Sequence, residues 1–344
     1  MTQHQLSYKK PLFVLALLTI VAFFINVSLG SVHIPISEVI EGLFTGSTEK
    51  TSWNYILFDY RIPKAITAIA AGGGLAISGL LMQTVFRNPL AGPFVLGLSS
   101  GASLGVALLI LGAGAFGGVF GMLLGNSWSL VIAAALGSFI VLLAVLAVTI
   151  KVKDTMAILI IGLMFGSITA AVVGVLSYFS SAEQLQQYIF WSFGSLGNQS
   201  WTGIAILITC FVVGLVIALA SSKSLNALLL GENYAKSMGL HIKRQTLFII
   251  LATSILAGSI TAFAGPIAFV GLAVPHLTRQ IIKTSNHLVL IPAVTLMGAL
   301  LLLICDTIAQ LPFSEYTLPI NAITSMVGAP VVIWLLVRKQ KLLF

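Results

Sequence analysis

Long apolar runs, separated by short polar breaks, fill the chain from residue 11 to residue 337. A helix needs roughly 20 apolar residues to cross a bilayer, and many of the runs have this length. The alternating ten-residue segments of a membrane β-barrel are missing from the sequence. The pattern therefore predicts ten membrane-spanning helices, of which the seventh and eighth could instead form one, at residues 11–30, 64–86, 92–113, 128–150, 155–179, 201–221, 245–264, 266–282, 288–311 and 319–337.

The composition also places the chain in a membrane. Of its 344 residues, 58% are hydrophobic and only 8% are charged, which is too little charge to cover a soluble surface of this size. The net charge of +8 comes from scattered basic residues without a nucleic-acid-binding motif, so no nucleic-acid partner is expected. We predict an all-α polytopic membrane protein, in which residues 1–344 form a single transmembrane domain surrounded by lipid.

The basic residues predict how the helices are oriented. If the N-terminus lies in the cytoplasm, all but three of the 17 Lys and Arg residues fall on the cytoplasmic side of the ten spans. This distribution matches the excess of Lys and Arg in the cytoplasmic loops of membrane proteins. Both termini are therefore predicted to be cytoplasmic, and the three exceptions are Lys50, Arg61 and Lys64.

Charged residues near the outer ends of two spans are candidates for a functional site. Arg61 and Lys64 lie at the start of the second span, where the helix dipole disfavours a cation. They either pair with nearby Asp59 or Glu49, or receive acidic groups from a protein partner outside the membrane. Asp306 lies within the ninth span, where a carboxylate is costly, so it is either functional or a structural group at the outer interface.

The longest predicted cytoplasmic connection covers residues 222–244. Helix-forming residues fill positions 224–238, and Gly231 and Gly239 interrupt them. This pattern predicts two short helices, at about residues 223–241, that lie against the cytoplasmic face. The alternative is an ordinary amphipathic helix at the membrane interface.

A polar turn, RNPLAGP, begins at Arg87 and separates the second and third spans. Asn88 can cap a helical turn, and Pro89 can open one without losing a backbone donor. The third span begins with AGPFVLGL at Ala91, and AGPIAFVGL at Ala264 begins the eighth. Helices five apart start from opposite sides of the membrane, so the echo predicts an inverted repeat, unless it is chance similarity in a biased composition.

The chemistry of the chain favours transport driven by another protein. It has no G-x-x-x-x-G-K-[ST] motif for ATP, so we expect no cofactor bound by this chain. The spans lack the chain of ionisable residues of a proton-coupled pump and the side-chain arrangements of an intramembrane enzyme, although a secondary transporter or facilitator remains the alternative.

The histidines are scattered, so no metal site is predicted. A bulky chelate would cross a weakly polar passage, whose candidate lining is Gln83, Ser103, Ser167 and Thr169.

Five segments carry a family resemblance along nearly the whole chain: RIPKAITAIAAGGGLAISGLLMQTVFRNPLAGPFVLGLSSGA from Arg61, YIFWSFGSLGNQSW from Tyr188, LLGENYAKSMGL from Leu229, FVGLAVPHLTR from Phe269 and VGAPVVIWLL from Val327. In this order they resemble the FecCD-type permeases, the membrane subunits of ATP-driven importers for iron-siderophores, haem and cobalamin. The resemblance implies the type II ABC importer permease fold and a homodimer in the bacterial inner (plasma) membrane. It also implies two ATP-binding subunits, which hold ATP and Mg, on the cytoplasmic face and one substrate-binding protein on the outer face.

The resemblance further implies roles for individual residues, with an iron-siderophore favoured as substrate over haem or cobalamin. Arg61 and Lys64 are expected to receive carboxylates of the binding protein. The cytoplasmic gate is expected at Asn88, Pro89 and Leu90. Contact with the ATPase is expected from Leu230, Gly231, Glu232, Ala235, Met238 and Gly239. In its last outer loop the chain departs from the family pattern at three positions, Gln310, Thr317 and Asn321. These differences put the details of docking at that loop in doubt.

Overall fold

The structure is a computed structural model that describes residues 3–112, 127–151, 155–197 and 199–337. Within these ranges the elements are helices, and no β-strand is present. The prediction of an all-α protein is therefore confirmed.

Seven helices in the described ranges are long and apolar enough to cross a membrane. They are α1 (Gln3–Ser28), α4 (Ile62–Val85), α8 (Ser127–Lys151), α9 (Thr155–Phe179), α11 (Trp201–Ala220), α14 (Ile242–Ala264) and α16 (His287–Ala309). Shorter helices occupy the three remaining predicted spans, namely α5 (Leu98–Ile110), α15 (Val270–Ile281) and α17 (Ile320–Val337). Each of the ten predicted spans thus contains a helix, and the seventh and eighth are separate.

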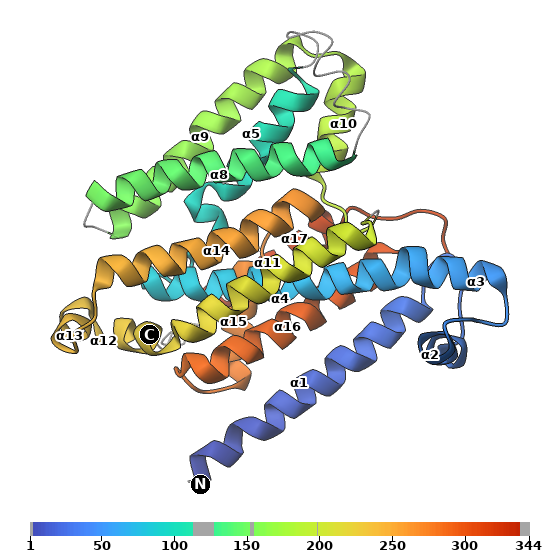
Figure 1. The fold of residues 1–344 in the computed structure, drawn as a ribbon, viewed down its shortest axis with the longest axis horizontal. Coiled ribbons are helices and arrows are strands. Elements are labelled where there is room, and N and C mark those ends of the chain that lie inside the picture. Colours follow the sequence, from blue (N-terminus) through green and yellow to red (C-terminus); the bar gives the residue numbers. More distant parts are fainter. Residues whose placement is uncertain (1–2, 113–126, 152–154, 198, 338–344) are drawn as a thin grey trace.

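The helices pack around α4, which runs through the middle of the bundle (Figure 1). A layer of α5, α8 and α9, joined by α10 (Ala182–Ser192), lies on one side against α14, and α1 lies on the other side against α16. One end of the bundle carries α2 (Ile36–Thr45) and α3 (Thr51–Tyr55), and the opposite end carries α12 (Ser222–Leu230) and α13 (Glu232–Ser237). These are called the α2 end and the α12 end.

Glycines let α4 lie unusually close to its neighbours. A methyl group on Gly79 would overlap the carbonyl oxygen of Gly271 in α15, and one on Gly72 would overlap that of Gly298 in α16. Small residues at such crossings are the usual means by which membrane helices bring their backbones together. The central position of α4 therefore follows from its Ala- and Gly-rich sequence.

The first helix begins, and the last helix ends, at the same end of the bundle. Asn26, near the end of α1, contacts Asp306 near the end of α16, and Asn321, at the start of α17, donates to Phe193 O beside the same end. Lys64 belongs to the same cluster and lies at the start of α4, the end of that helix that is joined to α3. The cluster is therefore at the α2 end. α1 therefore begins, and α17 ends, toward the α12 end. This shared side agrees with the distribution of basic residues, whereas the assignment of that side to the cytoplasm stays a prediction.

The two AGP segments begin their helices in similar ways. After the first, a short 3-10 helix, η2 (Pro93–Leu96), ends at Gly97, whose φ is 72°, and α5 starts at the next residue. After the second, Phe269 has a φ of 65°, and α15 starts at the next residue. Ala91 follows α4 at the α12 end, whereas Ala264 accepts a bond from Ser195 N at the α2 end. Their opposite positions are those of an inverted repeat.

Candidate functional site

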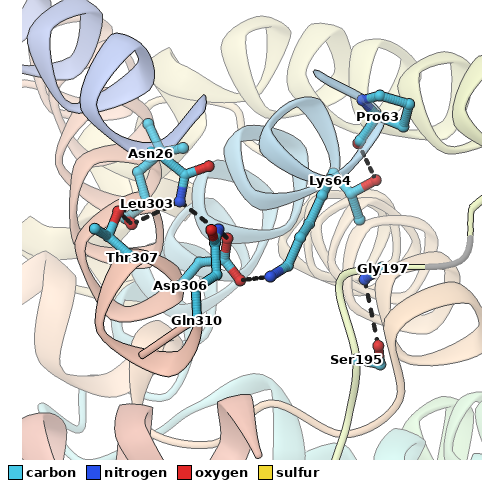
Figure 2. Close-up of polar contacts among 10 residues, drawn as sticks. Asn26, Pro63, Lys64, Ser195, Gly197, Leu303, Asp306, Thr307 and Gln310 are labelled. Carbon is cyan, nitrogen blue, oxygen red and sulfur yellow. Dashed lines mark hydrogen bonds and ion pairs between the residues drawn. The ribbon is translucent and has the colours of Figure 1, made fainter. Parts of the chain in front are cut away.

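A buried ion pair lies at the α2 end of the bundle (Figure 2). Lys64 Nζ is 3.0 Å from Asp306 Oδ1, and Asp306 is only 1% exposed. The other carboxylate oxygen accepts hydrogen bonds from Asn26 Nδ2 at 2.9 Å and from Gln310 Nε2 at 2.8 Å. Lys64 therefore pairs with a carboxylate 242 positions later, and Asp306 is held by side chains from α1 and α4 and by the Gln310 that caps its own helix.

Arg61 is fixed by backbone carbonyls. Its Nη1 donates to Val27 O at 2.9 Å and to Ser28 O at 2.8 Å, and its Nη2 donates to Val32 O. The first two carbonyls belong to the last turn of α1, whose dipole is negative at this end. This environment offsets the unfavourable position of a cation at the start of α4. Arg61 is 7% exposed, so it ties the turn after α1 to the start of α4.

A cavity of about 740 Å³ opens beside these charges. Its walls come from the start of α4, the loop after α10 and the loop after α16, and include Arg61, Lys64, Gln310, Glu315 and Thr317. Two of the three positions that depart from the family pattern therefore line the cavity.

The third such position, Asn321, has a different role. Its Oδ1 accepts a hydrogen bond from Ala268 N at 3.0 Å, and its backbone N–H donates to Phe193 O at 3.2 Å. Asn321 thereby fixes the segment that leads into α15.

The polar turn after α4 lies at the opposite end of the bundle. Asn88 Oδ1 accepts from Leu90 N at 2.9 Å, and Asn88 O accepts from Ala91 N at 3.0 Å, so this residue organises the turn. His276 Nε2 lies 2.7 Å from Pro89 O, which attaches the turn to α15. The histidine therefore bonds to the backbone of the turn. Leu90 is 40% exposed at this surface.

The two short helices predicted near residues 223–241 are present as α12 and α13. Gly231 separates them with a φ of 122°, and Gly239, with a φ of 82°, follows α13. Leu230 and Met238 are 66% and 60% exposed, whereas Ala235 is buried against the bundle. A second cavity, of about 590 Å³, lies between these helices and the end of α4, and Glu232 is among its walls.

The four candidate lining residues do not gather at one surface. Gln83 has no exposed surface, and its amide bonds to Leu272 O and to Arg279 Nη1, both at 3.2 Å. Ser103 bonds to the Tyr188 hydroxyl between α5 and α10. Ser167 and Thr169 lie on α9 and differ in exposure, since Ser167 is exposed and Thr169 is buried. Their role in a passage stays a prediction.

Sequence reasoning missed two asparagines in these clusters. Asn26 holds Asp306 at the α2 end, and Asn226 bonds to His287 at the α12 end. A signal for the first was present, because an amide within an apolar membrane span needs a polar partner. Asn226 lies in a polar connection and carried no such signal. Among the described residues, no group of three His, Cys, Asp or Glu residues could hold a metal ion.

A bundle of apolar helices long enough to cross a membrane, with different polar surfaces at its two ends, defines a polytopic membrane protein. The profile of the FecCD transport family matches residues 18–338, and the chain therefore belongs to this family. It is 34% identical over 331 residues to the Hemin transport system permease protein HmuU of Yersinia pestis, an alignment that covers 96% of this chain and 95% of the relative.

Two further comparisons agree with this family. The chain is 34% identical over 333 residues to the Vitamin B12 import system permease protein BtuC of Klebsiella pneumoniae, covering 96% of this chain and 95% of that protein. A solved chain of a metal-chelate type ABC transporter in an inward-facing conformation superposes with a TM-score of 0.81 at 29% identity, covering 97% of this chain and 100% of the other. The predicted resemblance and importer-permease fold are confirmed.

Proposed function

We propose that this chain is the membrane-spanning subunit of an ATP-driven importer that takes up a metal chelate. The observation that carries the proposal is the FecCD match over residues 18–338, which includes the helix pair at the α12 end. In the working transporter, two copies of the chain form a homodimer with two ATP-binding subunits and one substrate-binding protein. The chain itself performs no catalysis, since ATP and Mg bind to the ATPase subunits.

The α12 end is the contact with the ATPase in this proposal. Leu230 and Met238 are exposed apolar side chains on a polar connection, where they gain by burial against a protein partner. Gly231 and Gly239 adopt positive φ, which sets the turns that present these side chains. In this proposal the Asn88–Leu90 turn beside them serves as the cytoplasmic gate. Because α1 begins and α17 ends toward the same end of the bundle, the proposal also assigns both termini to the cytoplasm of a bacterial cell.

The α2 end receives the binding protein. Lys64 lines the cavity and keeps 22% of its side chain exposed, and in this proposal its ammonium group receives a carboxylate of the partner in addition to Asp306. Arg61 contributes a fixed positive charge next to it. Opposite charges across an interface raise the rate of encounter and set orientation.

The substrate class is a metal chelate such as an iron-siderophore, haem or cobalamin. The relatives compared above are named for hemin and for vitamin B12, and each is 34% identical to this chain, so identity favours neither. Direct binding of the partner binding protein to iron chelates, haem and cobalamin, measured by titration calorimetry, identifies the substrate.

The experiment that tests the proposal is uptake into proteoliposomes that contain this chain, its ATPase and its binding protein. We expect chelate uptake that requires ATP and stops when a substitution disables ATP hydrolysis by the ATPase. Uptake that survives this substitution and follows an ion gradient would instead assign the chain to secondary transport.

A further inference from the structure

We propose that Thr84, His287 and Asn226 form a hydrogen-bonded relay that couples movement of α12 to the gate turn at Asn88–Leu90. The inference rests on the proposed function, because it takes α12 and α13 as the contact with the ATPase. The three side chains come from three helices, namely α4, α16 and α12.

His287 is the central member of this relay. It is the first residue of α16 and has no exposed surface. Its Nδ1 lies 2.7 Å from Asn226 Oδ1, and its Nε2 lies 2.9 Å from Thr84 Oγ1. The backbone N–H of His287 donates to the same Asn226 oxygen at 2.9 Å. One buried ring therefore joins the middle of α12 to the last turn of α4.

The partners of the ring determine where its proton lies. An amide oxygen only accepts hydrogen bonds, so Nδ1 of His287 carries the proton and donates to Asn226. A ring without exposed surface is most stable in its neutral form, which leaves a lone pair on Nε2. Nε2 therefore accepts from the Thr84 hydroxyl. This hydroxyl also lies 2.8 Å from Leu80 O, one turn earlier in α4, so its single hydrogen has two acceptors.

The second acceptor makes the link between α4 and His287 easy to break. When His287 moves away, the Thr84 hydroxyl can rotate to Leu80 O and stay hydrogen-bonded. Without that alternative, a buried donor would lose its partner at a larger cost in free energy. A displacement of α12, passed on through Asn226, can thus release the end of α4. The Thr84 hydroxyl thereby gives the end of α4 two hydrogen-bonded arrangements, between which a displacement of α12 can select.

A second contact joins α12 to the same end of α4. Arg87 Nη2 donates to Leu228 O of α12 at 2.7 Å. Arg87 also has a φ of 46°, an uncommon conformation for a residue other than glycine, and surrounding contacts must hold it there. The next residue is Asn88, so α12 acts on the gate turn both through the relay and through Arg87.

The test compares Thr84→Val with Thr67→Val in the complete reconstituted transporter. Thr67 is a matched control because it lies in the same helix, has no exposed surface and donates to Pro63 O within α4 at 2.8 Å. We measure the amount of chelate transported per ATP hydrolysed. Thr84→Val should lower this ratio about fivefold, the factor that corresponds to one neutral hydrogen bond. Thr84→Ser, which keeps the hydroxyl, and Thr67→Val should keep the wild-type ratio.

Equal ratios for Thr84→Val and Thr67→Val would overturn the relay. If Thr84→Val does not assemble with the ATPase, Asn226→Ala decides, because the relay predicts the same lowered ratio and a wild-type ratio contradicts it. A wild-type transporter without ATP-dependent uptake would overturn the proposed function and the relay together. The two failures are thus distinguished by the wild-type measurement.

Discussion

The two ends of the bundle hold their polar groups with different chemistry. At the α2 end, Lys64 and Asp306 carry full charges, and Asp306 accepts hydrogen bonds from two amides as well. At the α12 end, α12 and α4 are joined by a buried ring, by a hydroxyl with an alternative acceptor, and by Arg87, which donates to a backbone carbonyl rather than to a carboxylate. A charged pair in a buried setting resists separation, whereas a neutral hydrogen bond with a second acceptor does not. The comparison indicates a rigid receiving surface at one end and a movable link at the other.

The largest effect is expected from Asp306→Ala. The substitution leaves the Lys64 ammonium without its carboxylate and removes the acceptor of Asn26 and Gln310. The free energy of unfolding should fall by about 3 kcal/mol, at the lower end for a broken buried pair because Lys64 is partly exposed. Thermal unfolding of the detergent-purified protein measures it. The double variant Lys64→Met, Asp306→Leu removes both charges and should recover most of the loss, and no recovery would contradict a charge-based explanation.

Arg61→Ala should have the next largest effect. It removes the donors of three carbonyl groups around the end of α1, and we expect a loss of about 2 kcal/mol in the same assay. Arg61→Lys keeps the charge but not the planar fork of donors, so its loss should be intermediate. If Arg61→Lys were as stable as the wild type and lost only its affinity for the binding protein, Arg61 would be a docking residue rather than a structural one.

A smaller change is expected from His276→Ala at the α12 end. The substitution removes the bond to Pro89 O and should lower stability by about 1 kcal/mol. It should also increase leakage of chelate from loaded proteoliposomes without ATP, because the gate turn loses its attachment to α15. His276→Gln, which retains a donor, serves as the control. Leakage at the wild-type rate in His276→Ala would mean that this contact does not hold the gate closed.

The smallest effect is expected from Lys64→Arg, which preserves the charge and its partner. Stability should change less than in Asp306→Ala, Arg61→Ala or His276→Ala because the ion pair is kept, and affinity for the binding protein should still fall with rising ionic strength. Lys64→Gln should flatten that dependence on salt. Surface plasmon resonance at several salt concentrations measures it, and an unchanged slope in Lys64→Gln would exclude Lys64 from the contact.

Local patterns predicted most of the fold. Apolar length located all ten helical segments, and Gly231 predicted the break between α12 and α13, because both depend on neighbouring residues. The third and eighth helices are shorter than the spans predicted for them, because a residue at positive φ, Gly97 or Phe269, delays the start of each helix. A phenylalanine at positive φ has no sequence signal, since residues other than glycine rarely adopt this conformation.

The candidate site was harder to predict because its contacts join distant parts of the chain. The sequence offered Asp59 and Glu49 as partners for Lys64, but neither position shares a helix face with it at a spacing of three or four residues. Asp306 reaches Lys64 and Asn26 only after α1, α4 and α16 have packed. The same holds for Asn226, His287 and Thr84, which lie far apart in sequence.

The assignment of partners to the two ends is the central claim, and protection of engineered cysteines tests it directly. In a background without the native thiols Cys210 and Cys305, one cysteine replaces Met238 at the α12 end and another replaces Phe313 at the α2 end, where both native residues are well exposed. A membrane-impermeant maleimide then labels each variant with and without each partner. We predict that the ATPase protects position 238 only and that the binding protein protects position 313 only. Protection of position 313 by the ATPase, or of position 238 by the binding protein, would contradict the account.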